Sequence, residues 1–130
     1  MQTSSSKKQI DDRKTIFCDL DGTVFLYCED FIDAAFSKSL KALPDVAETM
    51  SEWHCRGYHI VLTTARPEGM RPITVEQLKN AGIIYDQLVM GISAGPRYLI
   101  NDFNPLETPD GKAFAINVLR NVDGLSFVNI

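Results

Sequence analysis

The sequence predicts an α/β fold, a parallel sheet with helices on both faces. Short apolar runs of strand length alternate along the chain with segments of helical periodicity, the order typical of β-α-β units. Polar residues directly follow several of the apolar runs, where ligands bind in such sheets. The chain has 130 residues, of which 45% are apolar and 23% charged, an ordinary composition for a single globular core.

The N-terminal part is polar and then turns apolar. Residues 1–13 contain three consecutive serines and charges of both signs, so we expect a flexible tail there and one domain over residues 14–130. Thr15–Cys18 is a short β-type apolar run and predicts the first strand. A modest apolar stripe over residues 31–40 predicts a helix.

The central part carries clearer signals. Pro44 suits a first helical position, and Gly57 follows the last residue of helical spacing, which predicts a helix between them. Tyr58–Leu62 predicts a second strand, and Pro72–Ala81 a second long helix. Further short strands are predicted over Leu88–Met90 and Tyr98–Ile100, with Ala113–Val118 as a possible fifth.

Charge and cysteine usage exclude some classes of protein. The formal net charge of −4 gives no general attraction to nucleic-acid phosphates or to an anionic membrane. No apolar run is long enough to span a membrane, and the first residues lack a secretory signal. Three cysteines without a C-x-x-C pair argue against a disulfide framework or a zinc site. We therefore expect a cytoplasmic protein without a membrane partner.

Two carboxylates follow the first predicted strand. Asp19 and Asp21 are two residues apart, and such close like charges favour a bound cation between them. Mg²⁺ prefers oxygen ligands and retains waters that a phosphate can replace. Gly22 allows a sharp turn and the close approach of a ligand. The alternative interpretation is an ordinary Asp-Gly turn.

Two other predicted strands end in polar residues. Thr63 and Thr64, followed by Ala65 and Arg66, offer hydroxyls, loop amides and a guanidinium for phosphate oxygens. Asp102 follows the run Tyr98–Ile100 and adds a third carboxylate at the same sheet edge. Considered alone, Arg66 is equally consistent with an arginine at the protein surface. Asp102 alone is equally consistent with a turn residue.

Together these segments resemble the motifs of the haloacid dehalogenase-like (HAD) superfamily. Residues 17–23, FCDLDGT, are similar to motif I, hhhDxDGT, and residues 60–66, IVLTTAR, resemble motif II, an apolar strand ending in Ser or Thr. Residues 98–102, YLIND, resemble motif IV, an apolar strand ending in acidic residues. The motifs occur in the family's order, and the resemblance extends from about Lys14 to the C-terminus.

The resemblance implies roles for the matching residues. Asp19 would be the nucleophile, and Asp21 the general acid and base, a pair that marks phosphotransferases rather than dehalogenases. Thr64, preferred over Thr63 because Thr-Ala-Arg fits a family variant, would bind the phosphate with Gly22, Ala65 and Arg66. Mg²⁺ would be held by Asp19, the Asp21 carbonyl and Asp102.

The sequence departs from the family pattern at two places. Asn101 stands where motif IV usually begins with an acid, which either weakens metal binding or supplies an amide oxygen. The Lys or Arg of motif III is not evident. Arg97, Arg66 and Lys79 are the candidates, although a strand over Tyr98–Ile100 would begin with Arg97 about 16 Å from Asp102.

The function predicted is therefore a Mg²⁺-dependent phosphatase with an aspartyl-phosphate intermediate. The intervals between the motifs leave no room for a cap domain, so the chain resembles the capless subclass. An open site suits a sugar phosphate, a nucleotide end, a phosphorylated macromolecule or a second subunit as lid. The alternative is a catalytically silent phosphate- or metal-binding module. A response-regulator receiver is disfavoured, because no Asp follows the second strand.

Overall fold

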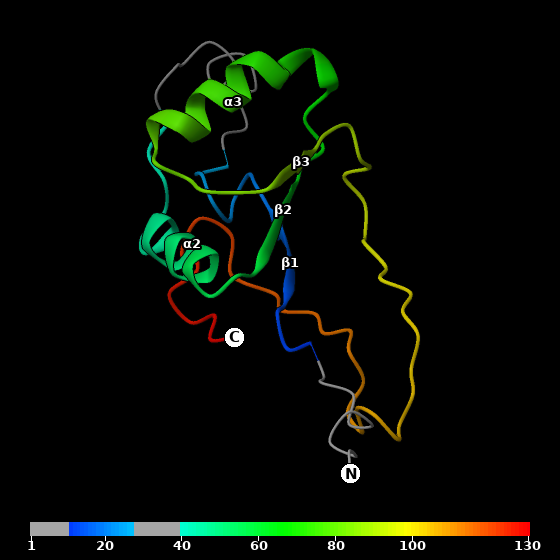
Figure 1. Cartoon of the computed structure of the whole chain (residues 1–130). Coiled ribbons are helices and arrows are strands. Elements are labelled where there is room, and N and C mark those ends of the chain that lie inside the picture. The colour runs from blue at the N-terminus through cyan, green and yellow to red at the C-terminus, as the bar shows by residue number, and fades with distance from the viewer. Residues whose placement is uncertain (1–10, 28–39) are drawn as a thin grey trace.

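The computed structural model describes residues 11–27 and 40–130 (Figure 1). The predictions for the tail before residue 11, for residues 31–39 of the helix expected over 31–40, and for Cys28 lie outside these ranges. The regular elements, in chain order, are strand β1 (Thr15–Asp19), helix α2 (Val46–Cys55), strand β2 (His59–Thr63), the 3-10 turn η2 (Glu68–Met70), helix α3 (Arg71–Asn80) and strand β3 (Gln87–Val89).

The three strands form one parallel sheet in the order β1-β2-β3. In its register Asp19 lies opposite Thr63, and Thr63 opposite Val89. The ends of all three strands therefore meet at one edge, as parallel pairing requires. The α/β fold class is confirmed, and α2 and α3 follow their predicted ranges within two residues.

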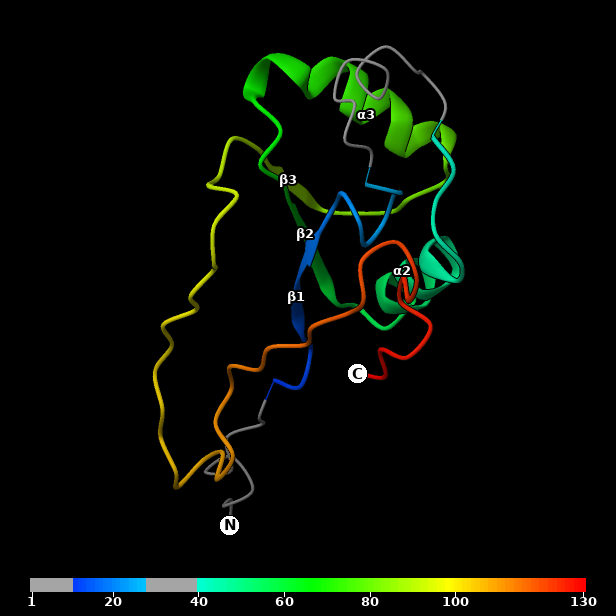
Figure 2. The ribbon, with the colours of Figure 1, turned by 180° about the vertical axis from the view of Figure 1, so that it is seen from behind.

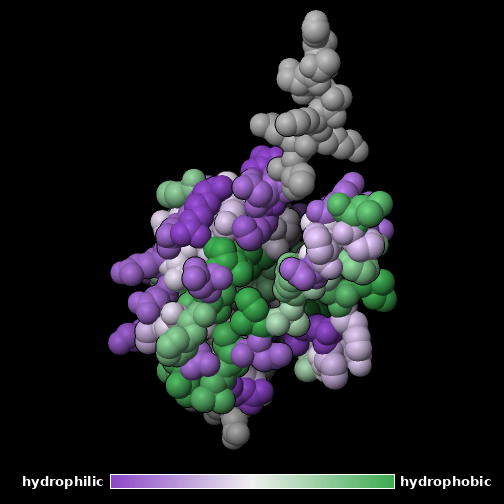
Figure 3. Space-filling model, turned by 90° about the horizontal axis from the view of Figure 1, so that it is seen from below, coloured by the Kyte–Doolittle hydropathy of each residue, from purple (hydrophilic) through white to green (hydrophobic). Residues whose placement is uncertain are grey.

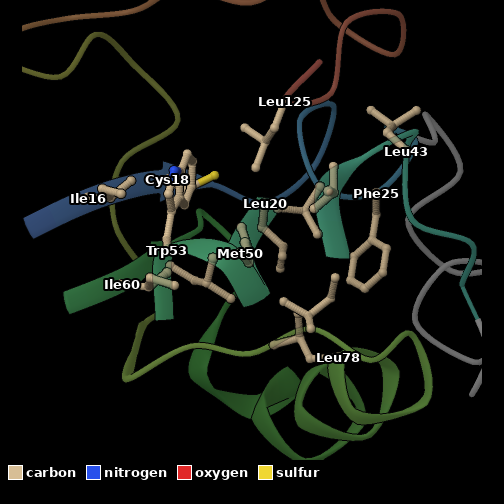
Figure 4. Packing of buried hydrophobic residues seen from close by; sticks show 14 residues of the cluster. Ile16, Cys18, Leu20, Phe25, Leu43, Met50, Trp53, Ile60, Leu78 and Leu125 are labelled. Atoms are coloured by element: carbon tan, nitrogen blue, oxygen red, sulfur yellow. The ribbon is translucent and has the colours of Figure 1, made fainter. Parts of the chain in front are cut away.

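One face of this sheet carries the core. Ile16 and Cys18 of β1 are buried, whereas Phe17 between them is 59% exposed on the opposite face. Ile60 and Leu62 of β2 lie on the buried face as well. Figure 4 shows this face packed against buried side chains of the two helices and of the loop after β1. The helix residues in the core cluster are Val46, Met50, Trp53 and Leu78.

Among the described residues, α2 and α3 both contribute to one core cluster. Figures 1 and 2 show residues 91–118 as an extended segment on the other side of the sheet. Apolar side chains are consequently exposed, and green patches interrupt the polar surface in Figure 3. Tyr98 and Ile100 are 89% and 94% exposed.

The strands predicted over Tyr98–Ile100 and Ala113–Val118 are absent from this segment. A short apolar run has β propensity but becomes a strand only when another strand pairs with it, and pairing is decided by tertiary structure. Among the described residues there is no separate cap domain. The same residues contain no helix with the length and apolar character of a membrane span.

Candidate active site

The loop after β1 is held tightly against the core. The carbonyl of Leu20 accepts N–H bonds from Thr23, Val24 and Phe25 at 3.3, 2.8 and 3.1 Å. The side chains of Leu20, Val24 and Phe25 are fully buried, so they anchor the loop from below. Because both backbone and side chains are fixed, the carboxylates of this loop are presented in a defined position at the sheet edge.

Gly22 is required by the geometry of this loop. Its φ of +91° lies in a region that L-residues rarely adopt. A Cβ at this position would also lie 3.1 Å from Cγ of Arg120. The structure thus explains the Gly of Asp-Gly-Thr by backbone conformation and by the close approach of Arg120.

Asp19 lies at the carboxyl end of β1 with 43% of its side chain exposed. Partial burial raises the pKa of this carboxyl, and the nearby Asp21 raises it further. Arg97 opposes the increase in the pKa, as do the backbone N–H of Leu20 and Arg120. Nη2 of Arg97 lies 3.6 Å from Oδ1 of Asp19. An accessible carboxylate therefore faces solvent beside a guanidinium.

Asp21 has a different environment from Asp19. Its two oxygens are bound by one guanidinium, with Nε of Arg66 donating to Oδ2 at 3.0 Å and Nη2 donating to Oδ1 at 2.8 Å. Only 23% of the Asp21 side chain is exposed. Fork-to-fork pairing of this kind fixes the orientation of both planar groups.

The remaining guanidinium nitrogen of Arg66 points to helix α3. Nη1 donates to Oγ1 of Thr74 at 3.0 Å and to Oε1 of Gln77 at 2.6 Å. Arg66 is 2% exposed, so all three of its side-chain nitrogens are engaged inside the protein. The structure thus places Arg66 beneath the site and not at the protein surface.

The two threonines of the predicted phosphate site lie in different environments. Thr63 pairs with Asp19 across the sheet and is partly exposed. Thr64 is 1% exposed, and its hydroxyl accepts the backbone N–H of Arg66 at 3.1 Å. Ala65 is exposed in the turn that follows. Thr63 is therefore the more accessible hydroxyl, whereas Thr64 supports the turn.

The loops after β2 and β3 are joined by backbone hydrogen bonds. The N–H of Gly91 donates to the carbonyl of Arg66 at 2.8 Å, and the N–H of Ile92 donates to that of Thr64 at 3.3 Å. This pairing directs the chain after β3 past the sheet edge and toward Arg97. No strand forms over Tyr98–Ile100, and Nη2 of Arg97 lies 3.6 Å from Oδ1 of Asp19.

The other candidates lie apart from Asp19. Lys79 is exposed on α3. Asp102 and Asn101 are exposed in the 91–118 segment, where the Asn101 amide donates to the carbonyl of Asp102 at 3.2 Å. Within the described part of the chain, no three Asp, Glu, His or Cys side chains are close enough to share a metal ion. The structure therefore brings Asp19, Asp21, Gly22, Thr63, Thr64, Ala65, Arg66 and Arg97 together and leaves Asp102 outside.

Two residues near the C-terminus, Arg120 and Asn121, hold the loop of the site although no sequence motif indicates them. The side chain of Asn121 accepts the N–H of Tyr27 at 2.6 Å and donates to its carbonyl at 3.3 Å. The Asn121 N–H donates to the carbonyl of Gly22 at 2.9 Å. The Arg120 guanidinium carbon lies 4.3 Å from the centroid of the Tyr27 ring. Neither residue lies in a recognisable motif, so only the folded chain shows that they close the loop.

A hollow between α2 and the C-terminal residues 125–130 contains none of these groups. The candidate site lies at the sheet edge, where 43% of the Asp19 side chain is exposed. It combines a half-exposed carboxylate, a second carboxylate with fixed orientation and an arginine beside the first.

Comparisons with known proteins bear on the fold of the chain. No protein-family model matches the chain, and no curated protein matches its sequence. Two solved structures are similar: "Structure of Pnkp1/Rnl/Hen1 complex", with a TM-score of 0.54 and 26% identity, and "Structure of the Pnkp1/Rnl/Hen1 RNA repair complex", with 0.55 and 28%.

The matches cover 71% and 75% of this chain but only 33% and 32% of the chains in those complexes. This chain therefore corresponds to about a third of each relative. A third structure, a magnesium- and phosphate-bound D,D-heptose 1.7-bisphosphate phosphatase from B. bronchiseptica, matches with a TM-score of 0.44 and 24% identity over 59% of this chain and 49% of that one. At this level of similarity it says nothing about the site.

Proposed function

We propose that the chain is a phosphohydrolase of the HAD superfamily with Asp19 as its nucleophile, because its fold and its first motif resemble that superfamily. One observation carries the proposal: the half-exposed Asp19 carboxylate lies beside Arg97, while Asp21 two residues later is held by Arg66. The two carboxylates thus have the distinct environments that distinct roles require.

Asp19 attacks the phosphorus of a phosphomonoester, so that one of its oxygens forms a bond to phosphorus and the ester oxygen leaves. Asp21 donates a proton to that leaving oxygen and later takes one from the water that cleaves the aspartyl phosphate. In the ion pair with Arg66, each Asp21 oxygen accepts one hydrogen bond and keeps a second lone pair for the proton transfer. Arg97 neutralises charge on the phosphoryl group, which we propose as the missing motif III role.

Magnesium fits the oxygen donors at this edge. We propose the Asp19 carboxylate and the Asp21 backbone carbonyl as its ligands, since Mg²⁺ is commonly bound through one or two carboxylates, substrate phosphate and water. When bound it would neutralise charge on the transferring phosphoryl group. We also propose that Asp102 or Asn101 becomes a further Mg²⁺ ligand when residues 98–102 move toward Asp19. The Mg²⁺ concentration that gives half-maximal activity, measured in Asp102→Asn and in the wild type, tests the role of Asp102.

The open site favours a phosphoester on a large or exposed substrate. The similar chains come from an RNA repair complex, so we propose a polynucleotide end phosphate as the first substrate to test and a sugar phosphate as the second. The net charge of −4 implies that binding would be local to the reacting end. We also propose that the protein acts without a cap domain.

The direct experiment measures phosphate release from p-nitrophenyl phosphate with and without Mg²⁺. We expect Mg²⁺-dependent turnover that Asp19→Asn abolishes, whereas the surface variant Arg13→Met retains it. Arg13 pairs with Asp11 near the N-terminal end of the described chain, and 67% of its side chain is exposed, so it controls for handling and purity. Absence of turnover on a broad phosphate-ester panel would falsify the proposal.

A silent phosphate- or metal-binding module is the second candidate, favoured by the absence of a third carboxylate at the site in the described residues. Beryllium fluoride distinguishes the two. A reactive Asp19 forms a complex with it that ¹⁹F NMR detects in the wild type and not in Asp19→Asn. Mg²⁺ binding without this complex indicates the silent module.

A further inference from the structure

The buried guanidinium of Arg66 connects helix α3 to Asp21, and the proposed chemistry does not by itself explain this connection. We propose that Thr74 and Gln77 of α3 are positioning residues that act through Arg66 to set the orientation of the Asp21 carboxylate. This inference rests on the proposed function, in which Asp21 transfers the proton. In this arrangement Arg66 orients Asp21 and does not contact the phosphate itself.

The geometry of Arg66 carries the inference. Nε and Nη2 bind the two oxygens of Asp21, while Nη1 binds Oγ1 of Thr74 and Oε1 of Gln77. A guanidinium is planar and rigid, so fixing Nη1 on one side determines where Nε and Nη2 point on the other. The Asp21 carboxylate can keep both short contacts only in one orientation.

Burial makes this arrangement costly to leave. Thr74 and Gln77 are fully buried, and Arg66 nearly so. A buried donor that loses its partner is not compensated by water, so the network holds one geometry rather than several. Only the Asp21 end is partly open, with 23% of its side chain exposed, at the sheet edge where a substrate can reach it.

Thr74 and Gln77 lie in a part of α3 that is anchored on the core. Thr74 and Gln77 are three residues apart and therefore on one helix face. The neighbouring Leu78 is fully buried in the core and secures that turn of the helix. The position of α3 on the core is thus transmitted to the site by three side chains.

The consequence concerns the leaving group. An alkoxide needs a proton as it leaves, whereas nitrophenolate does not. Disturbing Asp21 through its supports should therefore slow alkyl phosphates more than aryl phosphates and leave binding unchanged. Loss of folded protein would instead lower the rates on both substrates equally.

The test compares Thr74→Val, which keeps the side-chain shape but lacks the hydroxyl, with Thr74→Ser, which keeps the hydroxyl. The rates on glycerol phosphate and p-nitrophenyl phosphate are measured for both. We expect Thr74→Val to lower kcat on the alkyl ester about tenfold more than on the aryl ester, at constant KM. Thr74→Ser should restore the wild-type ratio. Gln77→Leu and Gln77→Glu form a second pair with the same expectation.

Two kinetic results would overturn the inference. Equal losses of kcat on both esters would show a merely structural role for Thr74 and Gln77. An increased KM at an unchanged ratio of rates would show that Arg66 itself contacts the phosphate. Wild-type protein without turnover is a failure of the proposed function and not of this network.

If the wild-type protein shows no turnover, ¹⁵N NMR of the Arg66 Nε–H measures the hydrogen bonding of Arg66 without the need for catalysis. We expect hindered rotation and slow exchange with solvent in the wild type and Thr74→Ser, and faster exchange in Thr74→Val. An Nε–H that exchanges in the wild type as fast as that of the exposed Arg13 would overturn the inference.

Discussion

The guanidinium of Arg66 and the carboxylate of Asp21 form a two-point ion pair between residues 45 positions apart in the chain, with contacts of 3.0 and 2.8 Å. The pair joins the turn after β2 to the loop after β1. It is both a structural link between two neighbouring strand ends and part of the proposed catalytic arrangement, so its effects on stability and on activity have to be measured separately.

Replacing Arg66 with Met is expected to destabilise the fold by about 2–3 kcal/mol, because Asp21, Thr74 and Gln77 all lose a partner. The value lies below that of a fully buried pair since part of Asp21 is exposed. Urea unfolding followed by circular dichroism measures the change. The control Arg13→Met removes an exposed pair and should leave the unfolding midpoint unchanged.

Removing Arg97 is expected to raise the pKa of Asp19 further. Burial already raises this pKa and Arg97 opposes the increase, so Arg97→Ala removes an opposing charge. A ¹³C NMR titration of the Asp19 carboxyl in metal-free protein measures the shift. Arg71→Ala, which removes an arginine paired with Glu68, is the control, and an equal shift in that variant contradicts the assignment.

The same pKa has a consequence for stability. Since the pKa of Asp19 is higher in the folded chain than its ordinary 3.8, the folded state binds more protons in the window just above that value. The contribution of Asp19 to stability is therefore favourable at lower pH and is lost as pH rises through the folded pKa. Asp19→Asn should be more stable than the wild type above this window, as measured by unfolding at pH 7.

Replacing Gly22 with Ala is expected to cost about 1–3 kcal/mol and most of the activity. The positive φ strains any L-residue, and the added Cβ would lie close to the Arg120 side chain. Thermal unfolding and turnover measure the two effects. The matched control is Gly69→Ala, where a Cβ has no atom within 4 Å and φ is not positive. Similar losses in both variants would show that the conformation of Gly22 is not the cause.

Asn121 is expected to stabilise the loop through its side chain and its conformation. Its φ of +62° favours Asn or Gly. Asn121→Gly keeps that conformation but loses both bonds to Tyr27, at about 1 kcal/mol each, and Asn121→Ala adds about 1 kcal/mol of backbone strain. Unfolding experiments should therefore rank the wild type above Asn121→Gly and Asn121→Gly above Asn121→Ala. The reverse order of the two variants would contradict the role of the backbone.

Elements with local signals were predictable. Apolar spacing, Pro and Gly predict helices α2 and α3, and polar residues follow strands β1 and β2. The prediction for Tyr98–Ile100 was wrong because three apolar residues specify a strand only when a partner is available. The run is 57–94% exposed instead of paired.

The sequence by itself determined which side chains lie at the end of β1. Asp19, Asp21 and Gly22 lie within four positions of one short motif, and their proximity follows from covalent geometry and the strand that precedes them. Tertiary structure alone decided the partners of each carboxylate. Contacts across 45 and 78 residues, from Arg66 to Asp21 and from Arg97 to Asp19, depend on how loops pack at a sheet edge, and no local pattern encodes that packing.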